Sequence, residues 1–570
     1  MNTNKPWLKF YEPHVPEHIA YPETTLPAIL ADMADKYPQH PAIIYKDRLL
    51  SFREFNAAVD RFAAALQGLG VGKGDRVAIH LPNCPQFPIA FYATLRIGAI
   101  AVPCNPVYTA RELKHQLKDS GPGVILTFSP MVAMLRQIRS DTGLQHVIVA
   151  QLKTYFPAFT RILFTLMLEK KMGHRVDISG EPGTYWFTDL LSRAPARPQP
   201  VEVNGEDTAV LLYTGGTTGI SKGAVLTHRS ILANAYQANT WTNGVEGQDS
   251  TLTALPLFHS YAMTMCMNTS IAGAGTMILV PDPRNMDDIL KTIHKHRPKY
   301  YPAVPAMYIA IINHPEVHRY RLDSIKACCS GAAPLPVEVQ ERFQQLTGAH
   351  LVEGYGLSEA SPVTHGNPTY GECRIGTIGI PWPDTEARIV DLDTGATVLD
   401  PGKVGELCVR GPQVMKGYWN MPTETANVLR SDPSGGAPWL HTGDIAVMDE
   451  DGYFRIVDRK KDMILGAGGE NIYPREIEDV LYEHPKVQEA VALGLPVPGK
   501  GERVKVYIRL KDGQAATPEE IIAFCAENLA IYKVPKYVEF RDQLPKTLVG
   551  KILRRELIKE ENERRAAAEQ

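Results

Sequence analysis

The feature that most constrains the fold is a repeated switch between helical and strand spacing of the apolar residues. Apolar residues recur at helical spacing from Phe52 to Leu69, and a glycine-rich stretch separates this segment from a strand-like run at 76–81. A second helical segment at 87–98 leads into the apolar run 99–103, and the same alternation returns between 286 and 353. Alternating helices and strands predict an α/β protein with an open sheet.

The chain has 570 residues, which is too long for a single hydrophobic core. Short strand-like runs between turns occupy 381–454 and predict a small β-barrel subdomain. A charged, glycine-rich joint at 459–469 precedes an expected helix and predicts a domain boundary. We therefore expect a large N-terminal domain of stacked α/β sheets over 1–458 and a smaller α+β C-terminal domain over 459–570. The charged segment Leu557–Glu569 is interpreted as a solvated helical tail.

One segment, Tyr213–Gly223, follows a buried strand and precedes an expected helix at 228–237. Its four glycines allow the backbone to approach a ligand closely, and its hydroxyl groups and one lysine can bind anionic oxygens. These are the properties of a phosphate-binding loop. The segment is not the common P-loop, because Lys222 is followed by Gly223 where that motif has its magnesium-binding hydroxyl. The alternative is a flexible surface turn.

Composition excludes several classes of function. The chain has 60 Lys and Arg against 63 Asp and Glu, so we expect neither a polyanion-binding surface nor a nucleic-acid partner. Its eight cysteines are scattered and contain no Cys-x-x-Cys, which indicates a reducing compartment rather than a disulfide framework or a zinc site. The N-terminus lacks the apolar region of a secretory signal, so we expect a cytoplasmic location.

Two apolar segments bear on contact with a membrane. Leu255–Pro281 is long enough to span a bilayer but contains His259, Asn268, glycines and prolines, so a buried helix followed by a buried strand is the preferred interpretation. Phe156–Met172 is rich in large apolar residues and is flanked by lysines and arginines. It is expected either to lie on the inner face of a membrane or to pack against its own domain, and the first alternative implies a lipid substrate.

Five further stretches place polar groups in settings typical of active sites. They are Pro256–Ser260 around His259, Gly354–Glu359, Trp439–Asp444, Ile456–Asp462 and Leu544–Lys551. Each has an ordinary structural explanation by itself, since a lone histidine is often a hydrogen-bonded core residue and a lone aspartate is often a turn residue. Their combination in this order, after the glycine-rich loop, is specific.

In this combination the chain resembles the adenylate-forming superfamily, which includes acyl-CoA synthetases, firefly luciferase and the adenylation domains of peptide synthetases. The resemblance covers nearly the whole chain and is closest to bacterial medium- to long-chain fatty acid–CoA ligases, at 351–359, 439–449 and 455–464. It implies an AMP-forming reaction that uses ATP, Mg²⁺ and CoA. A fatty acid carboxylate first attacks ATP to give acyl-AMP and pyrophosphate, and the acyl group then passes to the CoA thiol.

The resemblance also implies a role for each residue of the motifs. The residues that resemble the phosphate-binding loop are Thr214, Gly215, Gly216, Thr217, Thr218, Gly219 and Lys222. Glu359 matches a magnesium ligand, with Thr214 as the second, because Mg²⁺ prefers oxygen ligands. Lys551 matches the lysine that bridges the substrate carboxylate and the α-phosphate, and His259 resembles the residue at the mouth of the acyl tunnel.

Further residues are expected around the nucleotide and CoA. The adenine pocket is expected to include Gly331, Ala332, Ala333, Glu353, Gly354, Tyr355, Gly356 and Ser358, with Tyr355 stacked on the base. Asp444 is expected to bind the ribose hydroxyls, with Ile456 and Arg459 nearby. Lys461 corresponds to the hinge of a mobile C-terminal domain, whose rotation would withdraw Lys551 and bring Gly468 and Gly469 near CoA.

The sequence departs from the family pattern at three places, and two rival functions stay open. Ile220–Ser221 stands where proline is frequent, Ser358 stands where threonine is usual, and the run 464–471 is one residue longer than is common, which leaves the CoA-contacting glycines open. One rival is a CoA ligase for an aromatic or alicyclic acid. The other is a non-catalytic nucleotide-binding partner protein, which the joint presence of Lys551, Glu359 and Asp444 disfavours. Monomer and homodimer both stay open.

Overall fold

The computed structural model describes residues 5–214, 221–432, 435–466, 471–496, 502–546 and 552–568. By the contacts among its residues the chain divides into two compact units. The larger unit consists of Trp7–Glu386 and Arg410–Leu440, and the smaller unit of Met1–Pro6, Ala387–Val409 and His441–Gln570. The predicted hinge residue Lys461 lies inside the smaller unit, and the predicted boundary at 458/459 stays a prediction.

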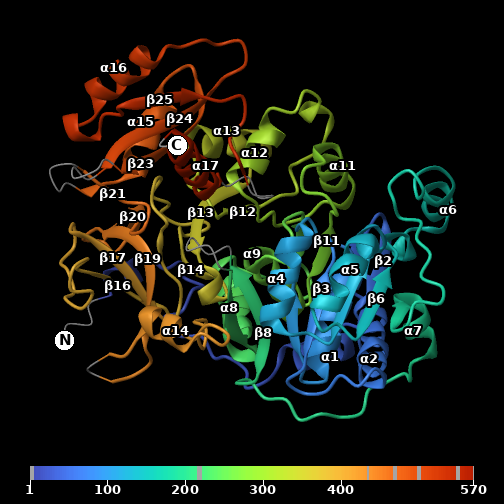
Figure 1. Cartoon of the computed structure of the whole chain (residues 1–570). Coiled ribbons are helices and arrows are strands. Elements are labelled where there is room, and N and C mark those ends of the chain that lie inside the picture. The colour runs from blue at the N-terminus through green and yellow to red at the C-terminus, as the bar shows by residue number, and fades with distance from the viewer. Residues whose placement is uncertain are drawn as a thin grey trace. The chain divides into compact units, whose positions relative to one another are not determined.

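The larger unit contains a seven-stranded sheet that is parallel except at one edge (Figure 1). In spatial order its strands are β7 (Thr184–Trp186), β6 (His146–Ala150), β5 (Val124–Phe128), β3 (Arg76–His80), β4 (Ile100–Pro103), β8 (Thr208–Thr214) and β9 (Lys222–Thr227). The central strands are almost wholly buried, as strands of parallel sheets usually are. This sheet confirms the predicted α/β class.

Helices form where caps and apolar stripes favour them. Ser51 and Glu54 form a capping box at the start of α2 (Phe52–Gly68), and Thr109 and Glu112 form another at α4 (Ala110–Ser120). The other helices of this part are α1 (Leu26–Lys36), α3 (Gln86–Arg96), α5 (Val132–Ile138), α6 (Ala158–Met167), α7 (Phe187–Arg193) and α8 (His228–Trp241). The predicted helices at 52–69 and 87–98 are thereby confirmed.

The described part of the larger unit also contains two four-stranded sheets. One has the order β10 (Ser250–Thr253), β11 (Thr276–Leu279), β1 (Pro41–Tyr45) and β2 (Arg48–Ser51). The other has the order β12 (Ala327–Ser330), β13 (His350–Gly356), β14 (Val363–Gly366) and β15 (Ile380–Pro381). Single bridges from Thr251 to Tyr300 and from Tyr300 to Ala327 connect β10 with β12.

The remaining helices of the larger unit follow the chain between these strands. They are α9 (Ser260–Ala262), the π-helix η5 (Met263–Asn268), α10 (Thr269–Ala272), α11 (Met286–His296), α12 (Pro305–Ile312), α13 (Val337–Thr347) and α14 (Pro422–Val428). The segment Leu255–Pro281 is therefore a buried helix followed by the buried strand β11, as predicted. In the described part of the chain, no helix combines the length and apolar character needed to cross a membrane.

The smaller unit contains β16 (Glu386–Val390), β17 (Val404–Arg410), β19 (Trp439–Met448) and β20 (Phe454–Arg459) over most of their lengths. The short pair β21 (Ile464–Leu465) and β22 (Asn471–Ile472) comes next, and then the sheet β23 (Val487–Pro496), β24 (Glu502–Leu510) and β25 (Tyr537–Phe540). Helices α15 (Pro474–Glu483), α16 (Pro518–Asn528) and α17 (Arg554–Ala568) belong to the same unit.

The interpretation of the last helix as a solvated tail was wrong. Leu557 of α17 is fully buried in a cluster with Tyr507 of β24 and Leu544. Glu561 is also buried and pairs with Lys505 of β24, and Tyr507 donates a hydrogen bond to it. The charged composition of this segment does not reveal that Leu557 and Glu561, which are one helical turn apart, pack against the rest of the smaller unit.

Candidate functional site

The phosphate-loop segment lies between two strands rather than between a strand and a helix. β8 and β9 are antiparallel neighbours, and Thr214 at the end of β8 pairs with Lys222 at the start of β9. The predicted loop residues Gly215, Gly216, Thr217, Thr218 and Gly219 lie outside the described residues. The strand β9 is not predicted from the sequence, because the glycine-rich segment is interpreted there as a turn that leads to α8.

Lys222 is held by groups that the sequence analysis did not identify. Its ammonium forms an ion pair with Glu424 of α14 and lies 5.2 Å from the centre of the Tyr418 ring. Residues 416–419 run beside β9, because Val225 donates to the Gly417 carbonyl and Trp419 donates to the Gly223 carbonyl. This backbone pairing brings Tyr418 next to the end of β9. The only local signal for this contact in the sequence is that the aromatic residue Tyr418 follows Gly417, and this signal is weak.

Glu359 lies in the same cluster. The Tyr418 hydroxyl donates a 2.7 Å hydrogen bond to Oε1 of Glu359, and Met415 donates its backbone N–H to the Glu359 carbonyl. Burial, and next to it the negative charge of Glu359, raises the pKa of Tyr418, so the phenol stays a neutral donor. One carboxylate oxygen is thereby oriented, and the half-buried side chain stands beside the cation of Lys222 and its partner tyrosine.

The predicted histidine segment lies beside Ser358 and Glu359. The hydroxyls of Ser260 and Ser358 are 3.3 Å apart. His259, which is half-buried, caps the short helix α9, and its Nδ1 accepts the backbone N–H of Tyr261. The Tyr261 hydroxyl donates to the Cys329 carbonyl at the end of β12, so one short helix connects the histidine to the next strand.

The carboxyl ends of β12 and β13 bring the predicted adenine-pocket residues together. Ser330 pairs with Glu353, so the turn beginning at Gly331 lies beside Gly354 and Tyr355. A Cβ at Gly354 would lie 2.8 Å from Sγ of Cys329, and one at Gly356 would lie 2.3 Å from the Pro362 carbonyl oxygen. Glycine is required at both positions by this close packing.

Ala332 has a φ of 67°, in the left-handed region that alanine seldom adopts. Such strained positions cluster at ligand sites because surrounding structure must hold them in place. Tyr355 is half-buried and meets the buried ring of His365 edge-to-face, 6.0 Å between centres. The larger unit thus brings Lys222, His259, Ser358, Glu359 and the predicted adenine-pocket turn to one region.

A cavity of about 200 Å³ lies beside β12 and β13 and is lined by residues that precede these strand ends. Cys328, Cys329 and Val352 of β12 and β13 form one part of its wall, and the end of α8, η5 and α10 form another. Apolar wall residues are Trp241, Met265, Ala272, Pro302, Ala327, Val352 and Trp382. Of the buried methionines at 263, 265, 267 and 307, Met265 alone lines this cavity.

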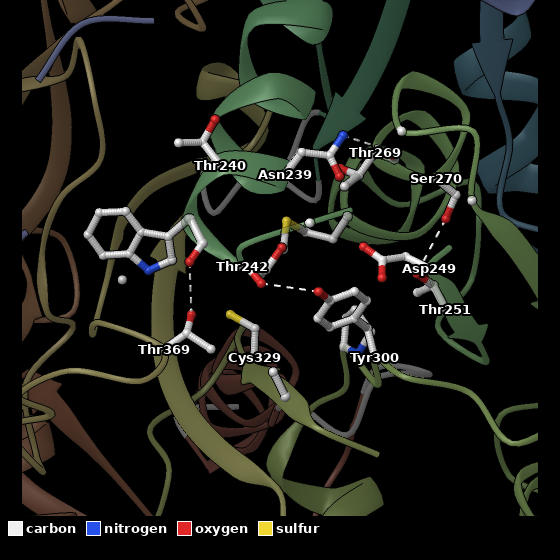
Figure 2. Close-up of a pocket in the computed structure, with 18 of the residues that line it drawn as sticks. Asn239, Thr240, Thr242, Asp249, Thr251, Thr269, Ser270, Tyr300, Cys329 and Thr369 are labelled. Atoms are coloured by element: carbon white, nitrogen blue, oxygen red, sulfur yellow. Dashed lines mark hydrogen bonds between the residues drawn. The ribbon is translucent and has the colours of Figure 1, made fainter. Parts of the chain in front are cut away.

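Polar wall residues of the cavity are largely bonded to the protein. Asn239 donates to the Thr269 carbonyl, Ser270 to Thr251, Tyr300 to the Thr242 carbonyl and Thr369 to the Trp241 carbonyl, as Figure 2 shows. Asp249 forms an ion pair with Lys299 and accepts the Val245 N–H. Two buried polar atoms of the lining residues, Thr269 Oγ1 and Trp382 Nε1, have no hydrogen-bond partner among the described residues, so the protein satisfies most but not all of the wall's polar groups.

The predicted ribose-binding residues lie in the smaller unit on two paired strands. Asp444 of β19 faces Arg459 of β20 across the antiparallel pair, and Arg459 Nε lies 3.0 Å from Oδ1 of Asp444. Ile456 is opposite Ala446 in the same pair. Asp444 is buried, whereas the arginine side chain is 40% exposed, so the carboxylate is fixed by a partner that can still reach solvent or a ligand.

A buried carboxylate supports the turn that carries Asp444. Glu406 of β17 accepts the N–H of Gly443 at 3.2 Å and lies near His441 (3.4 Å) and Lys460 (3.5 Å). Burial raises the pKa of the Glu406 carboxyl, but the hydrogen bond and charge of His441 and the charge of Lys460 outweigh it and leave the pKa lowered. The carboxylate therefore stays charged and binds the turn on one side, while Lys460 donates to the Leu392 carbonyl on the other.

A second buried carboxylate lies between Arg459 and α15. Asp458 accepts the backbone N–H groups of Arg459 and Arg475, at 2.7 and 2.8 Å. Burial raises its pKa to about 6 despite these two donors. Lys461 is exposed next to it. Arg554 forms ion pairs with Asp462 and Glu478 and thereby connects α17 to the predicted hinge and to α15.

The described residues offer a limited set of magnesium ligands. Among them, no group of three His, Cys, Asp or Glu side chains could hold a metal ion. Mg²⁺ is commonly bound by one or two carboxylates together with substrate phosphates and water. Glu359, with one oxygen oriented by Tyr418, fits this mode of binding. The Thr214 side chain, Gly468, Gly469 and Lys551 lie outside what the structure describes.

Comparisons with known proteins agree with this arrangement. Residues 30–419 match the AMP-binding enzyme family, and residues 476–551 match the AMP-binding enzyme C-terminal domain. A long-chain-fatty-acid–CoA ligase of Bacillus subtilis is 45% identical over 568 residues, which is 99% of each chain. A protein of the same name from Escherichia coli O157:H7 is 42% identical over 97% of this chain and 98% of its own.

Solved structures share the fold at lower identity. ATP-bound MatB from Rhodopseudomonas palustris superposes with a TM-score of 0.80 at 27% identity, over 94% of this chain and 98% of its own. The anthranilate CoA ligase AuaEII in complex with anthranoyl-AMP gives 0.79 at 26% identity, over 94% and 97%. The family match spans most of the chain and coincides with the clusters around Glu359 and the cavity. The chain belongs to the AMP-binding enzyme family.

Proposed function

We propose that the protein is an ATP-dependent fatty acid–CoA ligase. It converts a fatty acid and ATP to acyl-AMP and pyrophosphate, and then acyl-AMP and CoA to acyl-CoA and AMP. The observation that carries the proposal is the cavity walled by Ala327–Cys329 of β12 and Val352 of β13, the two strands whose carboxyl ends lead into the predicted adenine-pocket residues. Relatives of 42–45% identity that are named long-chain-fatty-acid–CoA ligases support the choice of substrate.

The cavity suits an alkyl chain. Most of its polar groups are bonded within the protein, and the wall between them is made of tryptophan, methionine, valine and proline side chains. Each methylene buried there contributes about 0.8 kcal/mol, or about fourfold in affinity, until the space is filled. Val245 and Glu246 at another part of the wall are exposed, so a longer chain can extend toward solvent there. His259 lies beside Ser358 and Glu359, where the substrate carboxylate is expected.

Residues of the larger unit support the first half-reaction. Negative charge collects on the phosphates as the carboxylate attacks, so cations and N–H donors are needed. Lys222, held between Glu424 and Tyr418, supplies one cation at the start of β9. Glu359 would hold Mg²⁺ with its free oxygen, and the bound ion would neutralise phosphate charge. Gly331–Ala333, Glu353–Gly356 and Ser358 would surround the adenine.

Residues of the smaller unit have proposed roles of their own. Asp444 would accept hydrogen bonds from the ribose hydroxyls, and Arg459 would balance its charge until a phosphate is present. Lys551 would bridge carboxylate and α-phosphate, and Gly468 and Gly469 would approach CoA after rotation at Lys461.

The proposal also includes a place for the enzyme in the cell. None of the eight cysteines forms a disulfide, which suits a reducing compartment such as the cytoplasm. Fatty acids partition into membranes, so a peripheral position on the inner membrane face suits the proposed substrate. The oligomeric state is left open between monomer and homodimer.

The test is production of AMP and pyrophosphate by the purified protein with Mg-ATP and CoA. Straight-chain acids from acetate to oleate are compared with benzoate and cyclohexanecarboxylate. We expect activity to rise with chain length and turnover to require CoA. Activity confined to ring acids would keep the mechanism and replace the substrate, and absence of activity with every acid would favour a non-catalytic protein.

A second test separates the two half-reactions. Lys551→Ala is expected to slow adenylate formation by at least about 10²-fold, by analogy with the loss of one oxyanion donor. Thioester formation from supplied acyl-AMP should be largely unchanged. Equal losses in both steps would contradict the proposed role of Lys551.

A further inference from the structure

The helix α6 turns its apolar stripe toward solvent. Phe159, Ile162, Leu163, Leu166 and Met167 follow the spacing i, i+3, i+4, i+7 and i+8, which places them on one face. In a surface helix this face normally covers the core. Here the five side chains are between 44% and 79% exposed, and no residue of α6 is buried. These five side chains therefore do not pack against the described residues of their own domain.

The opposite face of α6 anchors it to the larger unit. Phe164 meets Phe156 and His174 edge-to-face at 5.4 and 5.5 Å, and Phe156 is buried against Tyr45 of β1. Lys153 forms an ion pair with the buried Glu169, 2.6 Å apart. These contacts hold α6 in a fixed orientation through the face opposite the stripe. The stripe is exposed because of this anchoring. Figure 1 shows α6 beyond β6, at the edge of the larger unit.

The charges around the stripe have one sign. Lys170, Lys171 and Arg175 follow the helix and are exposed, and Arg161 is exposed on α6 itself. The single acidic residue between 153 and 176 is Glu169, which is buried and neutralised by Lys153. An apolar face bordered by cations is complementary to a bilayer surface that carries anionic headgroups.

We infer that α6 and residues 168–175 form a docking surface for a bilayer that contains anionic lipid. The stripe enters the interface between headgroups and acyl chains, and the lysines and Arg175 bind phosphate oxygens at its border. Ten residues of helix span about 15 Å, so α6 lies in the plane of the surface and does not cross it. A second copy of this chain fits less well, because pairing two stripes would bring cations of the same sign together.

The inference rests on the proposed function only for its purpose, which is to place the enzyme where its lipid substrate is dissolved. It is tested by sedimentation of the purified full-length protein with lipid vesicles. The vesicles contain phosphatidylcholine alone or phosphatidylcholine with 30 mol% phosphatidylglycerol. This is about one anionic lipid in three, a fraction within the range found in cell membranes. Binding is measured without ATP or substrate, so a failure of docking and a failure of ligase activity are separate results.

We expect binding to the anionic vesicles that weakens in high salt. Phe159→Ser with Leu166→Ser should weaken it at least about 30-fold, because two large apolar groups lose their burial. Lys170→Ala with Lys171→Ala should weaken it roughly 25-fold, about fivefold for each charge. Leu49→Ser with Leu346→Ser removes two other exposed leucines, which are 48% and 38% exposed, and should leave binding unchanged. The matched charge control is Lys291→Ala with Lys326→Ala.

Each other outcome overturns the inference. If the wild-type protein does not bind anionic vesicles, or if the control variants lose as much binding as the α6 variants, α6 is not a lipid-docking surface. If the stripe variants convert a dimer to a monomer in sedimentation equilibrium and vesicle binding is absent, the stripe is an interface between copies. Activity of each variant on soluble octanoate shows whether the fold is retained, because α6 lies outside the proposed active site.

Discussion

The two units hold their key carboxylates in different ways. Glu359 of the larger unit is oriented by a neutral phenol, Tyr418, that is 59 residues away in sequence. Asp444 of the smaller unit is paired with a cation, Arg459, on the adjacent strand. A carboxylate with a neutral donor keeps its full negative charge available to a cation. A carboxylate with an ionic partner is suited to accept hydrogen bonds from neutral hydroxyls without an excess of charge.

This difference indicates that the partner of each carboxylate suits the charge of the ligand expected there. The cluster around Glu359 would face Mg²⁺ and phosphates, and its cation Lys222 forms an ion pair with Glu424. The cluster around Asp444 would face a neutral ribose. Variants of these carboxylates and their partners therefore test whether the two sites differ in the way their contacts indicate.

The largest effect is expected for Glu359→Gln. Loss of the charge should slow adenylate formation about 10²- to 10³-fold, since a hard anionic ligand and its electrostatic contribution are both removed. Pyrophosphate release at several Mg²⁺ concentrations measures it, and the apparent affinity for Mg²⁺ should fall. Glu341→Gln, an exposed glutamate on α13, is the control. A loss below about threefold would show that Glu359 does not bind the ion.

Asp458→Asn tests a carboxylate of the smaller unit that serves stability. The folded-state pKa of about 6 lies above the usual 3.8, so the protonated form is favoured in the fold. Its contribution is fully present below pH 4 and is lost as the pH rises through 6, by up to about 3 kcal/mol. The difference in unfolding free energy between wild type and Asp458→Asn should therefore fall across this range.

The measurement for Asp458 is denaturant unfolding at pH 4 to 7, together with hydrogen exchange of the peptide that contains Arg475. The exposed Asp512→Asn is the control and should show no such trend. A constant difference between wild type and Asp458→Asn would mean that the carboxyl has an ordinary pKa in the fold.

Asp444→Asn should raise KM for ATP by about 10- to 100-fold with a smaller change in kcat. One hydrogen bond between a charged group and ligand is worth about 1.5–3 kcal/mol, and the loss also leaves Arg459 without its ion pair. Steady-state kinetics at saturating fatty acid and CoA measures it. A fall in kcat at unchanged KM would indicate a role in chemistry instead of nucleotide binding.

The smallest effect is expected for Tyr418→Phe. It removes one hydrogen bond to Glu359 and should reduce kcat/KM about fivefold. In the Glu359→Gln background the same change should have almost no further effect, because the two side chains act through one contact. Additive losses would separate Tyr418 from Glu359 and assign the tyrosine to Lys222.

The sequence predicted the site in the smaller unit better than the one in the larger unit, and for a physical reason. Asp444 and Arg459 lie on consecutive strands of one antiparallel pair, so chain connectivity brings them close together, and a register shift between Ile445 and Ala446 sets their exact pairing. Tyr418 and Glu424 reach Lys222 through pairing of residues 416–419 with β9, a strand that the sequence analysis did not predict. Long-range backbone pairing of this kind leaves no periodic signal.

The comparison of α2 with α6 gives the limit of what sequence determines. Both helices carry apolar residues at i, i+3, i+4 and i+7, and the sequence fixes this pattern and hence the helices themselves. Tertiary structure decides what each stripe contacts. In α2, Phe55, Val59, Phe62 and Leu66 are buried in the core, whereas in α6 the anchors Phe164 and Lys153 turn the stripe outward. The periodicity of a chain defines a face, but only the packing of distant residues determines whether protein, substrate or solvent lies against it.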